Sequence, residues 1–281
     1  MAIAFETVAS TAFPGGGLTV TIDKPTGLVV GDYMFAQIVA YGGTSWTTLT
    51  GWTALYNASP TLGGIGVPCA VLHKIADSAD VAASDFTFTV GDTGGVTEQG
   101  SGCISRISGM GILDGNVANT STTSSPFSFA SGIDPVYANG LILYFVFLGI
   151  NSAANVSSSS PSIATNNPTF TSRSNNAVNT ASRSVGRTFY TAPRPEVTAF
   201  GNVTISFAPA GVVAQSVMVH LVPEVNGTLS VTTGITHIIN QPFLRTGVVD
   251  VDGVDPTTNK IESAVWTPKV KTATTWTPEI K

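Results

Sequence analysis

Short runs of β-branched and aromatic residues, bounded by Gly, Pro, Asn and Asp, recur along residues 3–222, and helical periodicity is nearly absent. Residues 18–22 and 86–90 alternate between apolar and hydroxyl side chains, which indicates strands with one buried and one solvent-facing side. Residues 141–150 are continuously apolar but about half as long as a membrane span, so they predict a buried strand. The predicted strands are residues 3–9, 18–23, 33–41, 53–57, 67–75, 85–90, 103–108, 141–150, 169–172, 184–190, 203–208 and 216–222.

The order of these segments is similar in the two halves of the chain. Each half has a long apolar strand, then a strand that leads into a polar turn and back, then a closing strand. This order predicts an all-β fold, an antiparallel, jelly-roll-like β-sandwich made of two similar Greek-key-like halves in one domain. Residues 116–131, rich in Thr, Ser and Asn, are expected to connect the halves, and residues 157–162 to form a loop tip.

The character of the sequence changes after Pro223. Residues 226–260 mix short β-like pieces with Gly, Pro and Asp, and then the unit Trp266-Thr-Pro268 returns ten residues later as Trp276-Thr-Pro278. Two copies of so short a unit are too few for a core of their own, and a residue before proline favours an extended or turn conformation. Each tryptophan makes sense as an anchor that docks into a pocket.

We therefore expect residues 1–224 to form the β-sandwich domain and residues 225–281 to form an extended C-terminal assembly tail, with a small β subdomain left open. The residues expected to dock on other subunits are Trp266, Pro268, Trp276 and Pro278.

Composition narrows the range of partners. Only 10% of the residues are charged and the net charge is −5, so hydroxyls and amides must carry the surface. Such a surface suits a protein packed among other subunits, or one outside a cell, and it disfavours nucleic acid as a partner. The first ten residues lack the features of a secretory signal, so we expect synthesis in the cytoplasm and no membrane insertion. Cys69 and Cys103 are expected to be small core residues, with their pairing left open.

Nothing in the sequence singles out a catalytic group. His73, His220 and His237 are far apart in apolar, strand-like segments, and the acidic residues sit mainly at turns. We therefore expect no enzyme and no cofactor. The segment from Asp250 to Asp255 is rich in Asp, but its glycine falls at the fourth place and Ile261 at the twelfth, which fails the EF-hand pattern. We expect an ordinary acidic turn and no metal.

Two groups of residues allow an alternative, a carbohydrate- or receptor-binding surface. Four of the twelve basic residues fall within 22 positions, where they form either a contact surface for acidic glycans or acidic subunits, or a solvated loop edge. Two tryptophans flank residues 47–51, where they either stack on a sugar ring or cap the sandwich. These candidate residues are Trp46, Trp52, Arg173, Arg183, Arg187 and Arg194.

Several short motifs of the first half occur in a recognisable order. Gly31-Asp32 leads into a long apolar strand, and Gly51-Trp52-Thr53 follows a Thr-rich turn. Later pieces are Leu72-His73-Lys74-Ile75-Ala76, Ala83-Ser84-Asp85-Phe86-Thr87-Phe88 and Ile104-Ser105-Arg106-Ile107-Ser108-Gly109, and the second half ends in Val217-Met218-Val219-His220-Leu221-Val222-Pro223. In this order the pieces resemble a sandwich module of bacteriophage virion proteins, over residues 1–224. His73 stands where that family usually carries an aromatic residue.

The resemblance implies a virion surface protein of the decoration, fibre-base, spike or tail-associated kind. The Trp-Thr repeats look like the C-termini of phage tail and head-associated proteins, whereas residues 228–256 are not required by the module. No catalytic residues are recognised in that family, so none are carried over. The implied partners are other virion proteins and copies of this chain. The alternatives are a receptor-binding module of the adsorption apparatus that holds a host-surface glycan, and, less favoured, a surface hydrolase.

Overall fold

The computed structural model describes residues 3–13, 17–62, 64–91, 99–121, 127–129, 139–163, 168–179, 182–194, 202–209, 212–223, 229–230 and 249–250. Internal contacts divide the chain into Ala2–Pro223 and a second unit of Met1 with Glu224–Lys281. In the second unit the described strands are β20 (Leu229–Ser230) and β21 (Val249–Asp250), which pair in parallel. The expected docking residues Trp266, Pro268, Trp276 and Pro278 lie outside the described residues.

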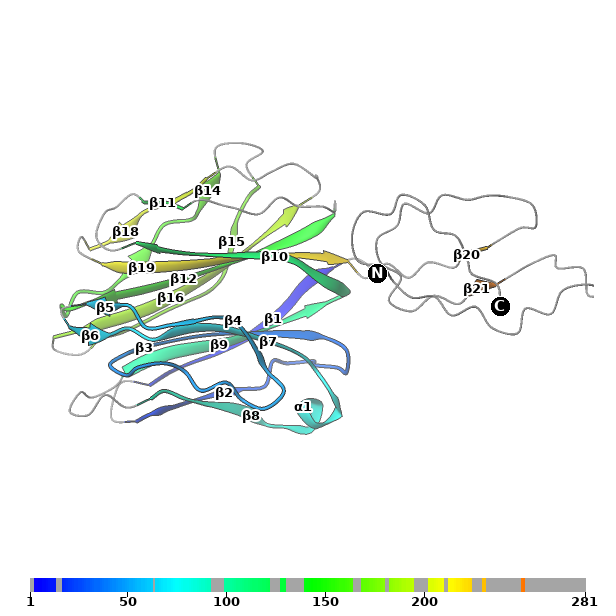
Figure 1. Cartoon of the computed structure of the whole chain (residues 1–281), viewed down its shortest axis with the longest axis horizontal. Helices are drawn as coiled ribbons and strands as arrows, with labels where there is room; N and C mark the ends of the chain where they lie inside the picture. Colours follow the sequence, from blue (N-terminus) through cyan, green and yellow to red (C-terminus); the bar gives the residue numbers. More distant parts are fainter. Residues whose placement is uncertain are drawn as a thin grey trace, which may run out of the picture. The chain divides into compact units, whose positions relative to one another are not determined.

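The all-β prediction is confirmed for Ala2–Pro223, whose described strands pair antiparallel (Figure 1). Two five-stranded sheets form its centre. Sheet 1 has the order β1 (Ala4–Phe13), β9 (Gln99–Ser108), β3 (Tyr33–Tyr41), β7 (Cys69–Ile75), β4 (Thr53–Ala58). Sheet 2 has the order β10 (Met110–Ser121), β19 (Val213–Pro223), β12 (Gly140–Ile150), β16 (Ser184–Arg194), β15 (Thr171–Asn179).

Sheet 1 takes all its strands from the first half of the chain and sheet 2 all of its strands from the second. If the strands of each sheet are numbered along the chain, both sheets have the order first, fifth, second, fourth, third. Each half also contains a pair of smaller strands at a corresponding place along the chain. The pair β2 (Thr19–Asp23) and β8 (Asp85–Thr89) stands in the first half where β11 (Phe127–Phe129) and β17 (Val203–Ile205) stand in the second. The fold is thus one strand plan used twice.

The link between the halves differs from the sequence expectation. Residues 116–131 do not form a connector, because β10 covers residues 110–121 and pairs with β19 from Met110↔Pro223 to Ser121↔Ala214. The chain instead passes from sheet 1 to sheet 2 through the single residue Gly109, whose φ of 66° favours glycine. Backbone pairing with β19 does not depend on side-chain type, which is why a polar segment serves as a strand here.

Two smaller expectations also change. The Ser-rich stretch at residues 157–162 is not wholly a loop tip, because it contains β13 (Ser157–Ser158) and the start of β14 (Ser162–Ile163). These strands pair with β18 (Phe207–Ala208) and β17. Residues expected as a turn form the short helix α1 (Ser78–Ala82). Elsewhere in this unit, β5 (Thr61–Leu62) and β6 (Ile65–Gly66) form a small hairpin.

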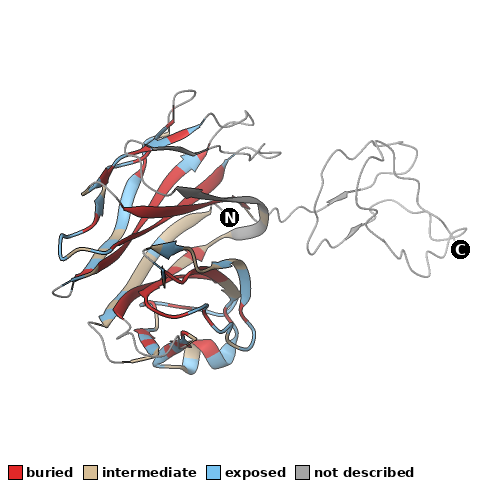
Figure 2. Cartoon of the chain, turned by 60° about the vertical axis from the view of Figure 1, so that its left-hand side comes forward, coloured by how far each residue is buried: buried red, intermediate tan, exposed pale blue. Residues whose placement is uncertain are grey.

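Apolar clusters lie on both faces of each large sheet. Figure 2 shows that buried residues run along the strands of both sheets. The alternate residues of β3 divide between two clusters: Phe35 and Val39 face sheet 2, whereas Met34 and Ile38 face β2 and β8. In the same way, alternate residues of β12 divide between the space shared with sheet 1 and the space under β14 and β17. Burial on both faces explains why these strands are almost continuously apolar.

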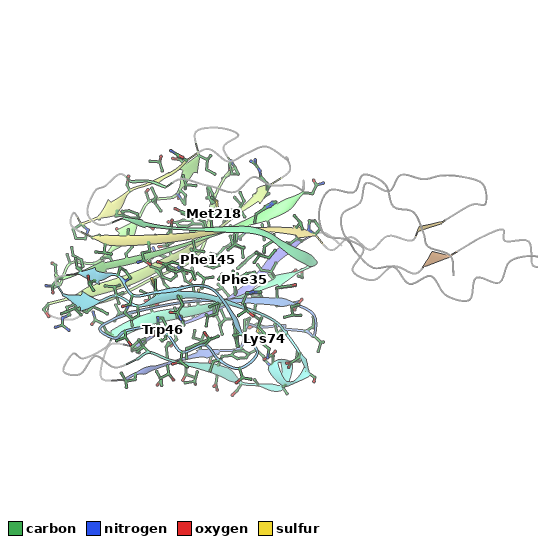
Figure 3. All side chains as sticks on the ribbon, in the orientation of Figure 1. Phe35, Trp46, Lys74, Phe145 and Met218 are labelled. Carbon is green, nitrogen blue, oxygen red and sulfur yellow. The ribbon has the colours of Figure 1, made fainter. Side chains whose placement is uncertain are left out.

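The cluster between the two large sheets joins the halves. Phe145 of β12 stacks on Phe189 of β16 with ring centroids 4.8 Å apart, and Phe35 of β3 approaches Phe145 at 6.3 Å. Figure 3 shows Phe35 and Phe145 between the two sheets. Each half therefore has an apolar cluster under its own small strands, and both halves share a third.

Replacement of Phe145 by Ala tests this shared cluster. We expect Phe145→Ala to lower the free energy of unfolding by about 3–5 kcal/mol, because it leaves a cavity between the sheets. Chemical denaturation followed by circular dichroism measures the loss. The control is Val30→Ala, at a side chain that is 64% exposed, with an expected change within about 0.5 kcal/mol. Equal effects of the two replacements would contradict a shared core.

Candidate functional site

The loop before β3 is held by a partly buried ion pair. Asp32 Oδ2 accepts a hydrogen bond from the backbone N–H of Val29 at 3.0 Å and another from Nε of Arg106 at 2.5 Å. Asp32 is buried, and Arg106 comes from β9, 74 positions later in the chain. Gly31 has a φ of 94°, a conformation in which glycine is not strained. These contacts fix the loop as a defined turn.

The fixed loop presents apolar side chains to solvent. Val29 is 52% exposed and Val30 is 64% exposed, and Ile75 at the end of β7 is 37% exposed. The loop and β7 are tied together, because the N–H of Gly31 donates to the carbonyl of Ala76 at 2.9 Å. Within the described residues these three are the exposed large apolar side chains. We call Val29, Val30 and Ile75 the apolar corner.

An open pocket of about 430 Å³ adjoins the apolar corner and shares Ile75 with it. The other lining residues are Tyr33, Gly51, Thr53, His73, Lys74 and Asp77. His73 stacks on Phe35 with ring centroids 6.0 Å apart and an interplanar angle of 21°. The imidazole of His73 thus packs as an aromatic ring on one neighbour and also lines the pocket.

The charged side of the pocket lies where β7 leads into α1. Asp77 caps this helix, and its Oδ1 accepts from the N–H groups of Ala79 and Asp80 at 2.8 and 3.0 Å. Lys74 Nζ lies 2.8 Å from Asp80 Oδ1 and 3.2 Å from Asp77 Oδ2. The sequence Asp77-Ser-Ala-Asp80 has the spacing of this capping box, whereas the sequence pattern places acidic residues mainly at turns.

The charges in the pocket favour a neutral or cationic ligand. Burial lowers the pKa of His73, so its imidazole is neutral near pH 7. Burial also opposes the charge of Lys74, but its hydrogen bonds to Asp80 and Asp77 raise its pKa overall. The backbone N–H of Asp80, followed by Lys74, lowers the pKa of Asp77. One ammonium group thus lies between two carboxylates, and Tyr33 and His73 supply aromatic rings.

The tryptophans expected to stack on sugars lie inside the molecule. Trp46 is 2% exposed, and its Nε1 donates to the carbonyl of Pro68 at 3.0 Å. Trp52 is 6% exposed and makes edge contacts with Phe86 and Phe88 at centroid distances of 5.7 and 5.5 Å. The sugar-stacking interpretation is therefore wrong. The rings have no open face, and both pack in the cluster between β2–β8 and sheet 1.

The four arginines also do not form a common surface. Arg187 is 1% exposed, and its Nη2 and Nη1 donate to the carbonyl of Gly102 and to Ser174 Oγ, each at 2.8 Å. Arg194 is buried as well. Arg173 lies 4.5 Å from the centroid of the Phe5 ring, and Arg183 lies 5.0 Å from that of Tyr41. The interpretation as a glycan surface or a loop edge is wrong for the two buried arginines, of which Arg187 lies on the same side of β16 as Val185 and Phe189.

Polar residues that sequence reasoning missed cross the space between the sheets. Gln37 of β3 donates through Nε2 to the carbonyls of Val146 and Thr188 at 2.8 and 3.2 Å. On sheet 2, Gln215 Oε1 accepts hydrogen bonds from Tyr56 and from Cys69 Sγ. A glutamine inside the apolar run of residues 33–41 was the available signal. Such pairs stabilise one alignment of the two sheets, since any other would leave buried amides unsatisfied.

The described cysteines and histidines lie in strands of the two large sheets. Cys69 and Cys103 are buried, free thiols, and burial raises the pKa of each. His220 is buried in sheet 2, apart from His73 in sheet 1, and His237 lies outside the described residues. Among the described residues no three His, Cys, Asp or Glu side chains gather as a metal site. No helix of the described ranges is long and apolar enough to cross a membrane.

Comparison with family models, with curated proteins and with solved structures finds no match to this chain. The candidate site is therefore defined by geometry alone: the apolar corner, the adjoining pocket and the ion group of Lys74, Asp77 and Asp80.

The Asp32–Arg106 pair can be tested by Asp32→Asn. We expect this change to lower the free energy of unfolding by about 3 kcal/mol, because it leaves the Arg106 charge without a buried partner. The measurement is a urea unfolding curve at neutral pH. Asp85→Asn, at an exposed carboxylate of β8, is the matched control and should change stability by no more than about 0.5 kcal/mol. An equally small effect of Asp32→Asn would show that the pair does not hold the loop.

The lowered pKa of His73 predicts a pH dependence with a definite sign. The unfolded chain protonates His73 near its ordinary pKa of about 6.5, whereas the folded chain protonates it only at lower pH. Stability should therefore decrease as the pH falls below about 6.5. His73→Phe keeps the stacking on Phe35 and removes the titration, so its unfolding midpoint should decrease less between pH 8 and pH 5.5. Parallel curves for the two proteins would contradict the assignment, since His220 and His237 are common to both.

Proposed function

We propose that this chain is a structural component of a bacteriophage virion, a tail-, spike- or capsid-associated surface protein. In this proposal residues 1–224 form a jelly-roll-like sandwich, and the tail of residues 225–281 docks on neighbouring subunits. The docking residues are Trp266, Pro268, Trp276 and Pro278.

One observation carries the proposal: the motifs that resemble the virion module contact one another. Asp32 of the first piece pairs with Arg106 of the last, and Trp52 of the second packs on Phe86 and Phe88 of the fourth. The third piece supplies β7 and the ion group of Lys74. Residues spread over 31–109 thus build one framework, which supports treating the pieces as a module and not as separate chance matches.

The surface and the interior both fit an assembly role. Charged residues are few, and four of the six exposed positions of β15 are Thr, Ser or Asn. The unusual buried groups that the structure describes, such as Arg187, Gln37 and Trp46, hold strands and layers together. A subunit of this kind uses its side chains to keep a rigid shape among neighbours.

The docking part of the proposal predicts the effect of Trp266→Ala with Trp276→Ala. The full-length variant should fold normally but should be lost from particles when it replaces the wild-type chain in the host that produces them, because both aromatic anchors are gone. The measurement is an immunoblot of particles purified on a density gradient.

The control for this experiment is Thr274→Ala with Thr275→Ala, which changes two neighbours of Trp276 and keeps both tryptophans. Normal incorporation of the tryptophan variant would refute the tail as an anchor. Absence of the wild-type chain from purified particles would refute the virion assignment itself.

A further inference from the structure

The apolar corner lies at the end of Ala2–Pro223 where β3 begins and β7 ends. Tyr33 at the start of β3 pairs with Ile75 and with Ile107, and Met110 at the start of β10 pairs with Pro223. Only Gly109 separates β9 from β10, so the corner and Pro223 lie at the same end of the paired sheets. The chain thus leaves this unit at the end that carries the exposed valines.

Exposed carboxylates occur at the same end of the first half. Asp23 and Asp85 face each other in the register of β2 and β8, and both are exposed. Asp77 lines the pocket, with its side chain 55% exposed. Like charges placed opposite each other repel, so a cation that binds between them is favoured. At this end Asp23, Asp77, Asp80 and Asp85 outnumber the ammonium groups of Lys24 and Lys74, while Asp32 and Arg106 pair with each other, so the surroundings of the apolar corner are acidic on balance.

The two halves differ in charge although they share one strand plan. Residues 1–109 contain three basic and eight acidic residues, which gives a net charge of −5. Residues 110–223 contain four basic and three acidic residues, which gives +1. A basic partner is therefore attracted to the first half and not to the second.

One segment of the chain has the complementary chemistry. Residues 265–281 contain Lys269, Lys271 and Lys281 against the single acid Glu279, so the net side-chain charge of this segment is +2. The same segment carries both Trp-Thr-Pro units. Aromatic anchors flanked by lysines match an apolar corner with a pocket and carboxylates, and a pocket of about 430 Å³ falls in the size range that takes a compact organic group.

We propose that residues 265–281 of one copy dock on the apolar corner and its pocket in a second copy, with an indole against Tyr33 and His73 and a lysine beside Asp77. This proposal rests on the proposed function and names the surface that receives the tail. The 41 residues from 224 to 264 can span up to roughly 140 Å when extended, so the length of the chain permits docking on a neighbour. Such a contact joins unlike surfaces and therefore adds one copy after another.

The experiment uses full-length chains altered on one side of the contact at a time. The surface variant carries Val29→Ser and Val30→Ser, and the tail variant carries Trp266→Ala and Trp276→Ala. Sedimentation velocity over a range of concentrations should show the wild type forming species larger than dimers. Each variant alone should associate at least about tenfold more weakly. An equimolar mixture of the two should form dimers and stop there, because it contains one intact surface and one intact tail.

The controls separate this proposal from the previous one. Thr171→Ala with Ser172→Ala, on exposed positions of β15 in the second half, should leave association unchanged. Association should also weaken with added salt, which screens the lysine–carboxylate attraction. A surface variant that associates like the wild type would overturn the assigned surface, while loss of the tail variant from particles would still support the proposed function. A wild-type chain that stays monomeric would overturn the second copy as the occupant.

Discussion

Packing between the two five-stranded sheets is the constraint on which the rest of the structure depends. Because sheet 1 and sheet 2 cover each other with Phe35, Phe145 and Phe189, their outer faces need separate covers, which the small strands supply. Strands β3 and β12 are therefore apolar on both sides, and the pair β2–β8 alternates between buried and exposed residues. Apolar packing alone does not determine how sheet 1 is aligned on sheet 2. The hydrogen bonds of Gln37, Gln215 and Arg187 between the sheets favour one alignment.

The sequence predicted strands better than it predicted their partners. The apolar run at residues 33–41 has the same bounds as β3, and that at 141–150 differs from β12 by one residue, since continuous burial leaves a strong pattern. The pattern does not show which faces meet, so it left open whether Trp46 and Trp52 stack on a sugar or cap the sandwich, and it did not indicate that Arg187 reaches Gly102. Residues 110–121 form a strand because they pair with β19. This pairing joins segments that are distant in the sequence, so the local pattern does not show it.

The candidate site shows the same limit. Asp32, Trp52 and Arg106 could be quoted as motif pieces, but their contacts with one another depend on residues tens of positions apart. The apolar corner could not be predicted, because Val29 and Val30 resemble core residues until the turn held by Asp32 places them outside. The capping box of α1 was local and therefore available from the sequence, whereas the pocket beside it also needs Tyr33 and Thr53 from other strands.

The single-residue link at Gly109 has a consequence for how the two halves hold together. Two separate chains with the same strand plan would have to find each other at their prevailing concentration, and dilution would part them. Here the tether keeps one sheet in the immediate neighbourhood of the other, so association of the halves is an intramolecular step. Each sheet therefore meets its partner at a high effective concentration, so the two halves can differ in charge and still associate.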